Sequence, residues 1–171
     1  MNDPNDTPLW LFSLEFYAHD HVSECLLAIQ DASKANVNII LYLLWLASNF
    51  KQLSKTEIFS IINSTENWTQ NVVIQIREVR RYLKLVHRSA VRLPILSFKD
   101  KVKELEIQAE KIEQMFFYQM EVESPFGMPV NDAILAGREN LRSYEQLLQR
   151  PFPPERFNCL LNAFQDKLDA L

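Results

Sequence analysis

The sequence predicts an all-α fold: a single helical domain of seven or eight helices built around a long antiparallel helix hairpin. Three observations support this class. The 171 residues include only two glycines, which leaves few of the tight turns that join β-strands. Apolar side chains recur with the helical period of about 3.6 residues, and no run alternates apolar and polar residues long enough to form a strand. With 47% apolar and 23% charged residues, the composition excludes low-complexity disorder for most of the chain.

The first two helices follow a short N-terminal segment. Residues 1–7 are expected to be disordered or extended, with Thr7 as an N-cap and Pro8 at the first helical position. Asp20 is the expected cap of the second helix, where an apolar stripe begins at Val22 and continues to Ile29. The polar run at 31–36 predicts a turn.

The third and fourth helices carry clear start signals. Asn36 is the expected cap of a helix whose run at 39–47 is apolar on all sides, which predicts the most enclosed element of the fold. Ser54 followed by Glu57 three residues later is a capping-box signature for a short helix. A further boundary is expected near residues 64–68.

Two long heptad-patterned segments predict the hairpin of residues 70–93 and 98–121. Apolar residues run from Val72 to Leu93 at alternating spacings of four and three, and Pro94 is expected to end that helix. Ser97 and Asp100 are expected to cap the second helix. Its predicted seam is Val102, Leu105, Ala109, Ile112 and Phe116. The short connection makes an antiparallel pair the natural arrangement.

Two more helices complete the predicted domain of residues 1–171. A loop at 124–130 separates them from the hairpin. Asn131 or Asp132 is expected to start a helix that runs to Leu148, and the prolines at 151–154 interrupt it before a last amphipathic helix.

Several classes of function are excluded or disfavoured. Two glycines leave no Gly-rich phosphate loop and no dinucleotide-binding motif. Cys25 and Cys159 are far apart in the sequence, and each is followed by two leucines. This setting is typical of small buried side chains with reduced thiols, rather than of a disulfide or a paired metal site. The N-terminus lacks the basic region of a secretion signal, and the run at 39–47 is about half of a membrane span. We therefore expect a cytoplasmic protein with no membrane contact.

The charge is distributed unevenly along the chain. Residues 1–70 carry 3 basic and 8 acidic side chains (net −5), residues 71–103 carry 9 and 2 (net +7), and residues 104–171 carry 6 and 12 (net −6). In the predicted first hairpin helix the basic residues form a stripe that we expect to point outward, away from the seam: Arg77, Arg81, Lys84, Arg88 and Arg92.

The basic stripe has two interpretations. It is either solvated or paired with acidic neighbours, with Arg80 in reach of Glu106, Glu110 and Glu113, or it binds a partner or an anionic ligand. Nucleic acid is disfavoured, because the chain is acidic overall and only Tyr82 interleaves the stripe. A second polar group surrounds the predicted turn, where capping of two helix ends is favoured over ligand binding: Gln30, Asp31, Asn36 and Asn38.

Four segments together resemble a small proteobacterial family of hypothetical proteins: WLFSLEFY at 10–17, CLLAIQD at 25–31, VNIILYLLWLA at 37–47 and VVIQIREVRRYLK at 72–84. The resemblance covers roughly residues 9–120. It implies a bacterial source and a single helical domain, and it supplies no catalytic residues, because the family has no assigned activity. The family usually has a glycine in the turn after the Gln-Asp pair, where this chain has Lys34 and Ala35. This departure weakens any role of the turn in close approach to a ligand.

We interpret the chain as a non-enzymatic protein-interaction module with an adaptor or regulatory role. No nucleophile, base and orienting residue are recognisable as a set, and no cofactor or metal is expected. The alternative is an enzyme or a binder of a small anionic ligand, with a pocket between the first helices and the Arg-rich helix. The candidate ligand- or partner-binding residues are Tyr17, Asp31, Asn38, Arg77, Arg80, Arg81, Lys84 and Arg88.

Overall fold

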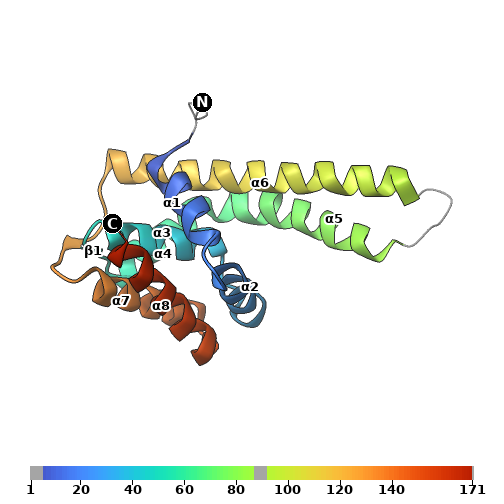
Figure 1. Cartoon of the computed structure of the whole chain (residues 1–171). Helices are drawn as coiled ribbons and strands as arrows, with labels where there is room; N and C mark the ends of the chain where they lie inside the picture. The colour runs from blue at the N-terminus through green and yellow to red at the C-terminus, as the bar shows by residue number, and fades with distance from the viewer. Residues whose placement is uncertain (1–5, 87–91, 171) are drawn as a thin grey trace.

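The predicted all-α class is confirmed by the computed structural model, which describes residues 6–86 and 92–170 (Figure 1). Within these residues 81% of the chain is helical. The predicted N-terminal segment falls largely outside them. The helical elements are α1 (Pro8–Tyr17), α2 (Val22–Ser33), α3 (Val37–Ser48), α4 (Lys55–Trp68), η1 (Thr69–Val73), α5 (Ile74–Leu85), α6 (Arg92–Glu123), α7 (Ala133–Leu148) and α8 (Pro154–Asp169).

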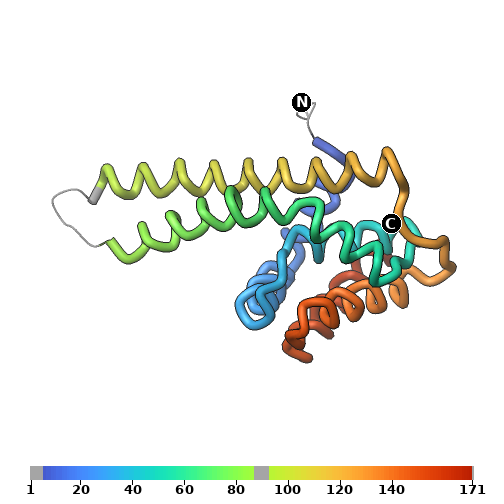
Figure 2. The backbone as a smooth tube through the Cα atoms, turned by 180° about the vertical axis from the view of Figure 1, so that it is seen from behind, coloured from blue at the N-terminus to red at the C-terminus, as the bar shows by residue number. Residues whose placement is uncertain are grey.

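The molecule consists of a helical body and a projecting hairpin. In Figure 1, α2, α3, α4, α7 and α8 gather on one side of α6, and α1 crosses α6 near its C-terminal half. Helices α5 and α6 lie side by side and extend well beyond this body. Figure 2 shows the same arrangement from behind, with α4 leading into α5 as one continuous rod. The predicted antiparallel hairpin is therefore present, and its distal half is covered by no other described element.

Four predicted helix starts are confirmed at the atomic level. The Thr7 hydroxyl accepts a hydrogen bond from a backbone N–H of α1, and the side chain of Asn36 does the same for α3. Ser54 and Glu57 form the predicted capping box of α4. Asp132, one of the two predicted candidates, caps α7. Each cap satisfies an otherwise unpaired backbone donor.

Other predicted boundaries were wrong. His21, in the left-handed conformation with φ 63°, occupies the N-cap position of α2 in place of Asp20. Pro94 does not end a helix: α6 begins at Arg92, so that Ser97 and Asp100 lie inside it. A proline is tolerated there because the N–H groups of the first helical turn have no intrahelical acceptor.

A π-helical turn replaces the boundary expected near residues 64–68. The chain passes from α4 through η1 into α5 without leaving the helical conformation. A π-turn adds residues to one turn and rotates the side chains that follow it. Consistent with this shift, Val73 is buried, whereas Val72, the start of the predicted seam, is only partly covered.

The expectation that no sheet forms was also wrong, because two short strands pair between the body and the loop after α6. Strand β1 (Lys51–Gln52) lies antiparallel to β2 (Met128–Pro129), with Gln52 opposite Met128. Gly127 makes this possible: its φ is +78°, and a Cβ there would stand 3.0 Å from the carbonyl oxygen of Gln52. Two-residue strands are too short to produce a sequence alternation.

The interior is centred on α3, as predicted. Ile40, Leu43, Leu44 and Leu46 are fully buried. Helix α7 packs closely against α3 at Gly137, where a Cβ would lie 2.9 Å from Phe164 of α8 and 3.3 Å from Leu44.

The two cysteines, Cys25 and Cys159, are both free thiols. Burial, with a smaller contribution from a hydrogen bond to Cys159, raises the pKa of Cys25 to about 11.

Candidate functional site

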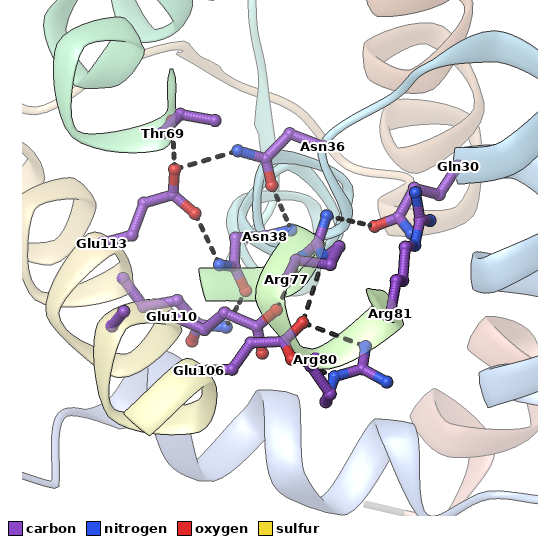
Figure 3. A network of polar contacts seen from close by, with 12 residues as sticks. Gln30, Asn36, Asn38, Thr69, Arg77, Arg80, Arg81, Glu106, Glu110 and Glu113 are labelled. Atoms are coloured by element: carbon purple, nitrogen blue, oxygen red, sulfur yellow. Dashed lines mark hydrogen bonds and ion pairs between the residues drawn. The ribbon is translucent and has the colours of Figure 1, made fainter. Parts of the chain in front are cut away.

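Arg77 is the centre of a polar cluster between the hairpin and the body (Figure 3). Its guanidinium donates from Nε to Glu106 Oε1 at 3.0 Å, from Nη2 to Glu110 Oε1 at 2.7 Å and from Nη1 to Gln30 Oε1 at 2.9 Å. Only 17% of its side chain is exposed. The expectation that this residue points outward was therefore wrong.

The other predicted arginines also have carboxylate partners. Arg80 donates two hydrogen bonds to Glu106, one of them at 3.1 Å, which confirms the predicted reach between α5 and α6. Arg81 is about half exposed and contacts Glu78 at 3.1 Å and Asp31 at 3.4 Å. Lys84 is exposed, and Arg88 lies outside the described residues. Internal pairing thus accounts for the part of the stripe nearest the body.

A chain of amide groups continues from this cluster to the buried carboxylate of Glu113. Asn36 Nδ2 donates to Glu113 Oε1 at 3.0 Å and Asn38 Nδ2 donates to Oε2 at 2.6 Å, while the Thr69 hydroxyl from the π-turn also donates to Oε1. Gln114 Nε2 donates to Asn38 Oδ1 at 2.9 Å. Three neutral donors therefore stabilise one buried carboxylate.

The network extends in two directions. The Ser13 hydroxyl of α1 donates to Gln114 Oε1 at 2.9 Å. At the other end, the Asn36 N–H donates to the Tyr144 hydroxyl of α7 at 2.9 Å. Among the described residues, every buried side-chain nitrogen and oxygen atom has a hydrogen-bond partner.

The inner face of α6 differs from the predicted seam. Val102 and Ala109 of that seam are buried, as predicted. The other buried positions of α6 are Glu106, Glu113, Gln114, Phe117 and Glu121. Leu105, Ile112 and Phe116, which were assigned to the seam, are instead exposed. Thr69, Gln114 and Ser13 belong to the network but were not among the predicted site residues. The available signal was the seven-residue spacing of Glu106 and Glu113, which places both on one face of a helix.

Two separate cavities, both lined in part by Arg77, lie where a single pocket was predicted between the first helices and the Arg-rich helix. The first, of about 490 Å³, lies between α1, α2, α3 and the hairpin, and its lining includes Tyr17, Asn38, Arg77 and Arg80. The second, of about 480 Å³, lies between the turn at 34–36, the π-turn, α5 and α7. It includes Asp31 and Arg81, so the structure does not bring these two residues together with Tyr17.

The carboxylates of the cluster differ in their pKa values. Burial alone would raise the pKa of Glu106, but hydrogen bonds from Arg80 and Arg77 hold this pKa below its ordinary value. Glu110 has Arg77 as its cation partner, and burial raises its pKa. Burial, reinforced by Glu110, also raises the pKa of the Tyr17 hydroxyl in the same cavity.

Five exposed apolar side chains lie on the hairpin, four of them along one stripe of α6 and one on α5, and we call this group the outer hairpin face. Their exposed fractions are 46% for Val79, 53% for Phe98, 52% for Leu105, 38% for Ile112 and 40% for Phe116. At 100° per residue, Leu105 lies about 160° and Ile112 about 140° around α6 from Ile107, which lines the first cavity. Val79 likewise lies about 200° around α5 from Arg77. The outer hairpin face is therefore turned away from both cavities.

Trp68 packs against the outer hairpin face at the end nearest the body. Its ring makes an edge-to-face contact with Phe116 at a centroid distance of 5.7 Å, and its Nε1 donates to the Ala109 carbonyl at 3.0 Å. These contacts join the end of α4 to the part of α6 that lies against the body.

The sequence comparison identifies the family. A model described as "Protein of unknown function (DUF2390)" matches residues 8–117, which is more than half of the chain. The chain belongs to the DUF2390 family. The predicted resemblance to a family without an assigned activity is thus confirmed. The DUF2390 region contains α1 to α5 and most of α6, including Asn38, Arg77 and Glu113, whereas Tyr144 and all of α7 and α8 lie beyond it.

Neither a curated protein nor a solved structure matches this DUF2390 member. Within residues 6–86 and 92–170, no three His, Cys, Asp or Glu side chains are grouped so that they could hold a metal ion. None of the described helices is both long enough and apolar enough to cross a membrane.

Proposed function

We propose that the chain is a protein-interaction module with an adaptor or regulatory role, and that it binds its partner through the outer hairpin face. The observation that carries this proposal is the group of five exposed apolar side chains on two helices that project from the body. Together they present roughly 400 Å² of apolar surface, a patch size that in monomeric proteins is often functional.

The interior of the hairpin supports the same proposal. Between α5 and α6 the ion pairs of Arg77 and Arg80 with Glu106 join the two helices, and Leu105 and Ile112 stay exposed outside this contact. Burial of this surface against a partner would contribute about 25 cal/mol per Å². An amphipathic helix pair that presents one apolar flank is a known means of recognising another helix.

Site-specific photo-crosslinking in the cells that produce the protein tests the proposal. A photoreactive residue at position 105 is expected to form a discrete protein adduct. The matched control is position 135, because Leu135 on α7 is 50% exposed but lies outside the outer hairpin face. No adduct at 105, or the same adducts from both positions, would contradict the proposal.

A second candidate function is an enzyme or small-ligand binder that uses the first cavity. The observation that favours it is Glu110, whose pKa burial raises and which lies in the same cavity as Tyr17 and Arg77. A carboxyl group with a raised pKa in a cavity is a candidate proton donor. The neutralisation of Arg77 and Arg80 by carboxylates makes an anionic ligand a weaker choice for this cavity.

Titration with a polyanion at two salt concentrations tests the anionic part of this alternative. Binding that weakens steeply as salt rises, and is reduced by Arg81→Glu, would support an anion site on the basic stripe. If the wild-type chain does not bind at low salt, the anion site is excluded.

A further inference from the structure

We propose that the occupant of the outer hairpin face is a second copy of this chain, packed antiparallel about a twofold axis at Leu105. This inference rests on the proposed function, because it uses the same face. In this arrangement Leu105 meets Leu105 of the second copy, and Phe98 meets Ile112 of the second copy on each side of the axis.

The register follows from the spacing along α6. Phe98, Leu105 and Ile112 are separated by seven residues each, so that they lie at intervals of about 10.5 Å on one flank of the helix. Equal intervals about a central residue allow one twofold operation to pair all three positions at once. An isologous interface requires this kind of self-complementary surface.

The available area matches a weak but specific dimer. Two copies of the outer hairpin face supply roughly 800 Å² of apolar surface, which corresponds to about 1,200 Å² in total when two-thirds of an interface is apolar. That value is near the lower limit for a specific interface. Val79 and Phe116 flank the central three residues and widen the contact.

Charge favours the antiparallel direction. Arg77, Arg80 and Arg81 are paired with carboxylates within the chain. The distal part of the hairpin still carries four lysines, at positions 84, 99, 101 and 103, against Asp100, whereas residues 1–70 and 104–171 carry more acidic than basic side chains. An antiparallel pair places the basic end of each hairpin toward the acidic remainder of the other copy. A parallel pair would bring the two basic ends together.

The position of the apolar residues argues against an anionic membrane as the occupant. Basic and apolar residues together near a hairpin end would also suit a lipid surface. However, Ile112 and Phe116 lie at the body end of the hairpin, where Trp68 contacts Phe116. A surface that extends along the helices fits another helix pair better than a bilayer.

The first experiment measures self-association of the full chain by analytical ultracentrifugation. The wild-type protein is expected to dimerise with rising concentration. Leu105→Lys places two like charges at the axis and is expected to weaken dimerisation at least about tenfold. Leu135→Lys is the matched control and is expected to dimerise like the wild type. Circular dichroism verifies that both variants stay helical.

The second experiment tests the register by disulfide trapping under mild oxidation. Leu105→Cys is expected to form a covalent dimer, because the two residues meet at the axis. Phe98→Cys alone is expected to form none, since its two copies are about 21 Å apart along α6, far beyond disulfide reach. A mixture of Phe98→Cys and Ile112→Cys is expected to cross-link. The wild-type chain controls for reaction of Cys25 and Cys159.

The outcomes separate this inference from the proposed function. A monomeric wild-type protein, or equal trapping by Leu105→Cys and Phe98→Cys, overturns the antiparallel dimer. If position 105 then cross-links to a different protein in cells, the proposed protein-interaction function is retained, and the partner on the outer hairpin face is that protein instead of a second copy. Binding of the monomer to vesicles that contain anionic lipid, lost in Leu105→Lys, would replace the second copy by a membrane surface and overturn the inference.

Discussion

Arg77 and Glu106 form an ion pair across the hairpin, with Nε and Oε1 3.0 Å apart and only 17% and 7% of the two side chains exposed. The pair connects α5 to α6 at the point where the hairpin leaves the body, and the same guanidinium reaches Gln30 of α2. The hairpin is thus joined to the body through this polar contact as well as through the buried ring of Phe117, which stacks on Tyr42 of α3.

Removal of Arg77 is expected to destabilise the fold strongly. Arg77→Met leaves Glu110 without its cation partner and Glu106 with Arg80 alone, in a mostly buried site, which should cost about 3 kcal/mol in the free energy of unfolding. Arg81→Met is the matched control: its ion pairs are half exposed, and a loss below about 1 kcal/mol is expected. Urea unfolding measures both, and equal losses would show that Arg77 is not the structural link.

The stability of the protein is expected to fall in acid through Glu106. Its pKa in the folded state is lowered, so its contribution is present above the ordinary glutamate pKa of about 4.3 and is lost as the pH falls through the folded-state value. Glu106→Gln should therefore reduce the dependence of stability on pH below about 4.3. Unfolding midpoints measured from pH 3 to 7 test this.

Glu110 is expected to have the opposite effect on the pH dependence of stability. Its folded-state pKa is raised, so its ionisation opposes folding as the pH rises from its unfolded value through the folded one. In the same pH series, Glu110→Gln should remove a decrease in stability that begins above about pH 4.3. A decrease that persists unchanged in this variant would assign it to another group.

Leu44 and Gly137 are expected to be energetically coupled. Leu44→Ala should cost about 2 to 5 kcal/mol, because the side chain is fully buried and its loss leaves a cavity. Gly137→Ala crowds Phe164 and Leu44, and this overpacking should cost about 1 kcal/mol net of the gain in helix propensity. The double variant should lose less than the two single variants combined. A loss below about 1 kcal/mol for Leu44→Ala would place α3 at the periphery.

Lys34→Gly is expected to stabilise the protein by about 0.5 to 1 kcal/mol. Lys34 is the C-cap of α2 and has a left-handed conformation with φ 57°, which a side chain disfavours. Ala32→Gly within α2 is the control and should destabilise by about 1 kcal/mol. Thermal unfolding compares them; destabilisation by Lys34→Gly would contradict this explanation.

Features that depend on neighbouring residues in the chain were determined by the sequence alone. Thr7, Asn36, Ser54 and Asp132 cap helices through contacts two or three residues away, so their patterns were sufficient to identify them. The burial of α3 also followed directly, because a helix that is apolar on every side must be enclosed. Membership of a helical family of unknown function was likewise evident from the segments between residues 10 and 84.

Only the tertiary structure decided which face of α6 is buried. Two sets of positions recur at heptad spacing and differ by one residue: Leu105 and Ile112 in one, Glu106 and Glu113 in the other. Which set is buried depends on the facing segments of the chain. These place Arg77 beside Glu106, and the side-chain amides of Asn36 and Asn38 beside Glu113. Hydrophobic periodicity correctly identified Val102 and Ala109 as buried. It was wrong for Leu105 and Ile112, because paired and hydrogen-bonded carboxylates can occupy an interior in their place. The leucine and isoleucine were left on the outside, where they form the outer hairpin face.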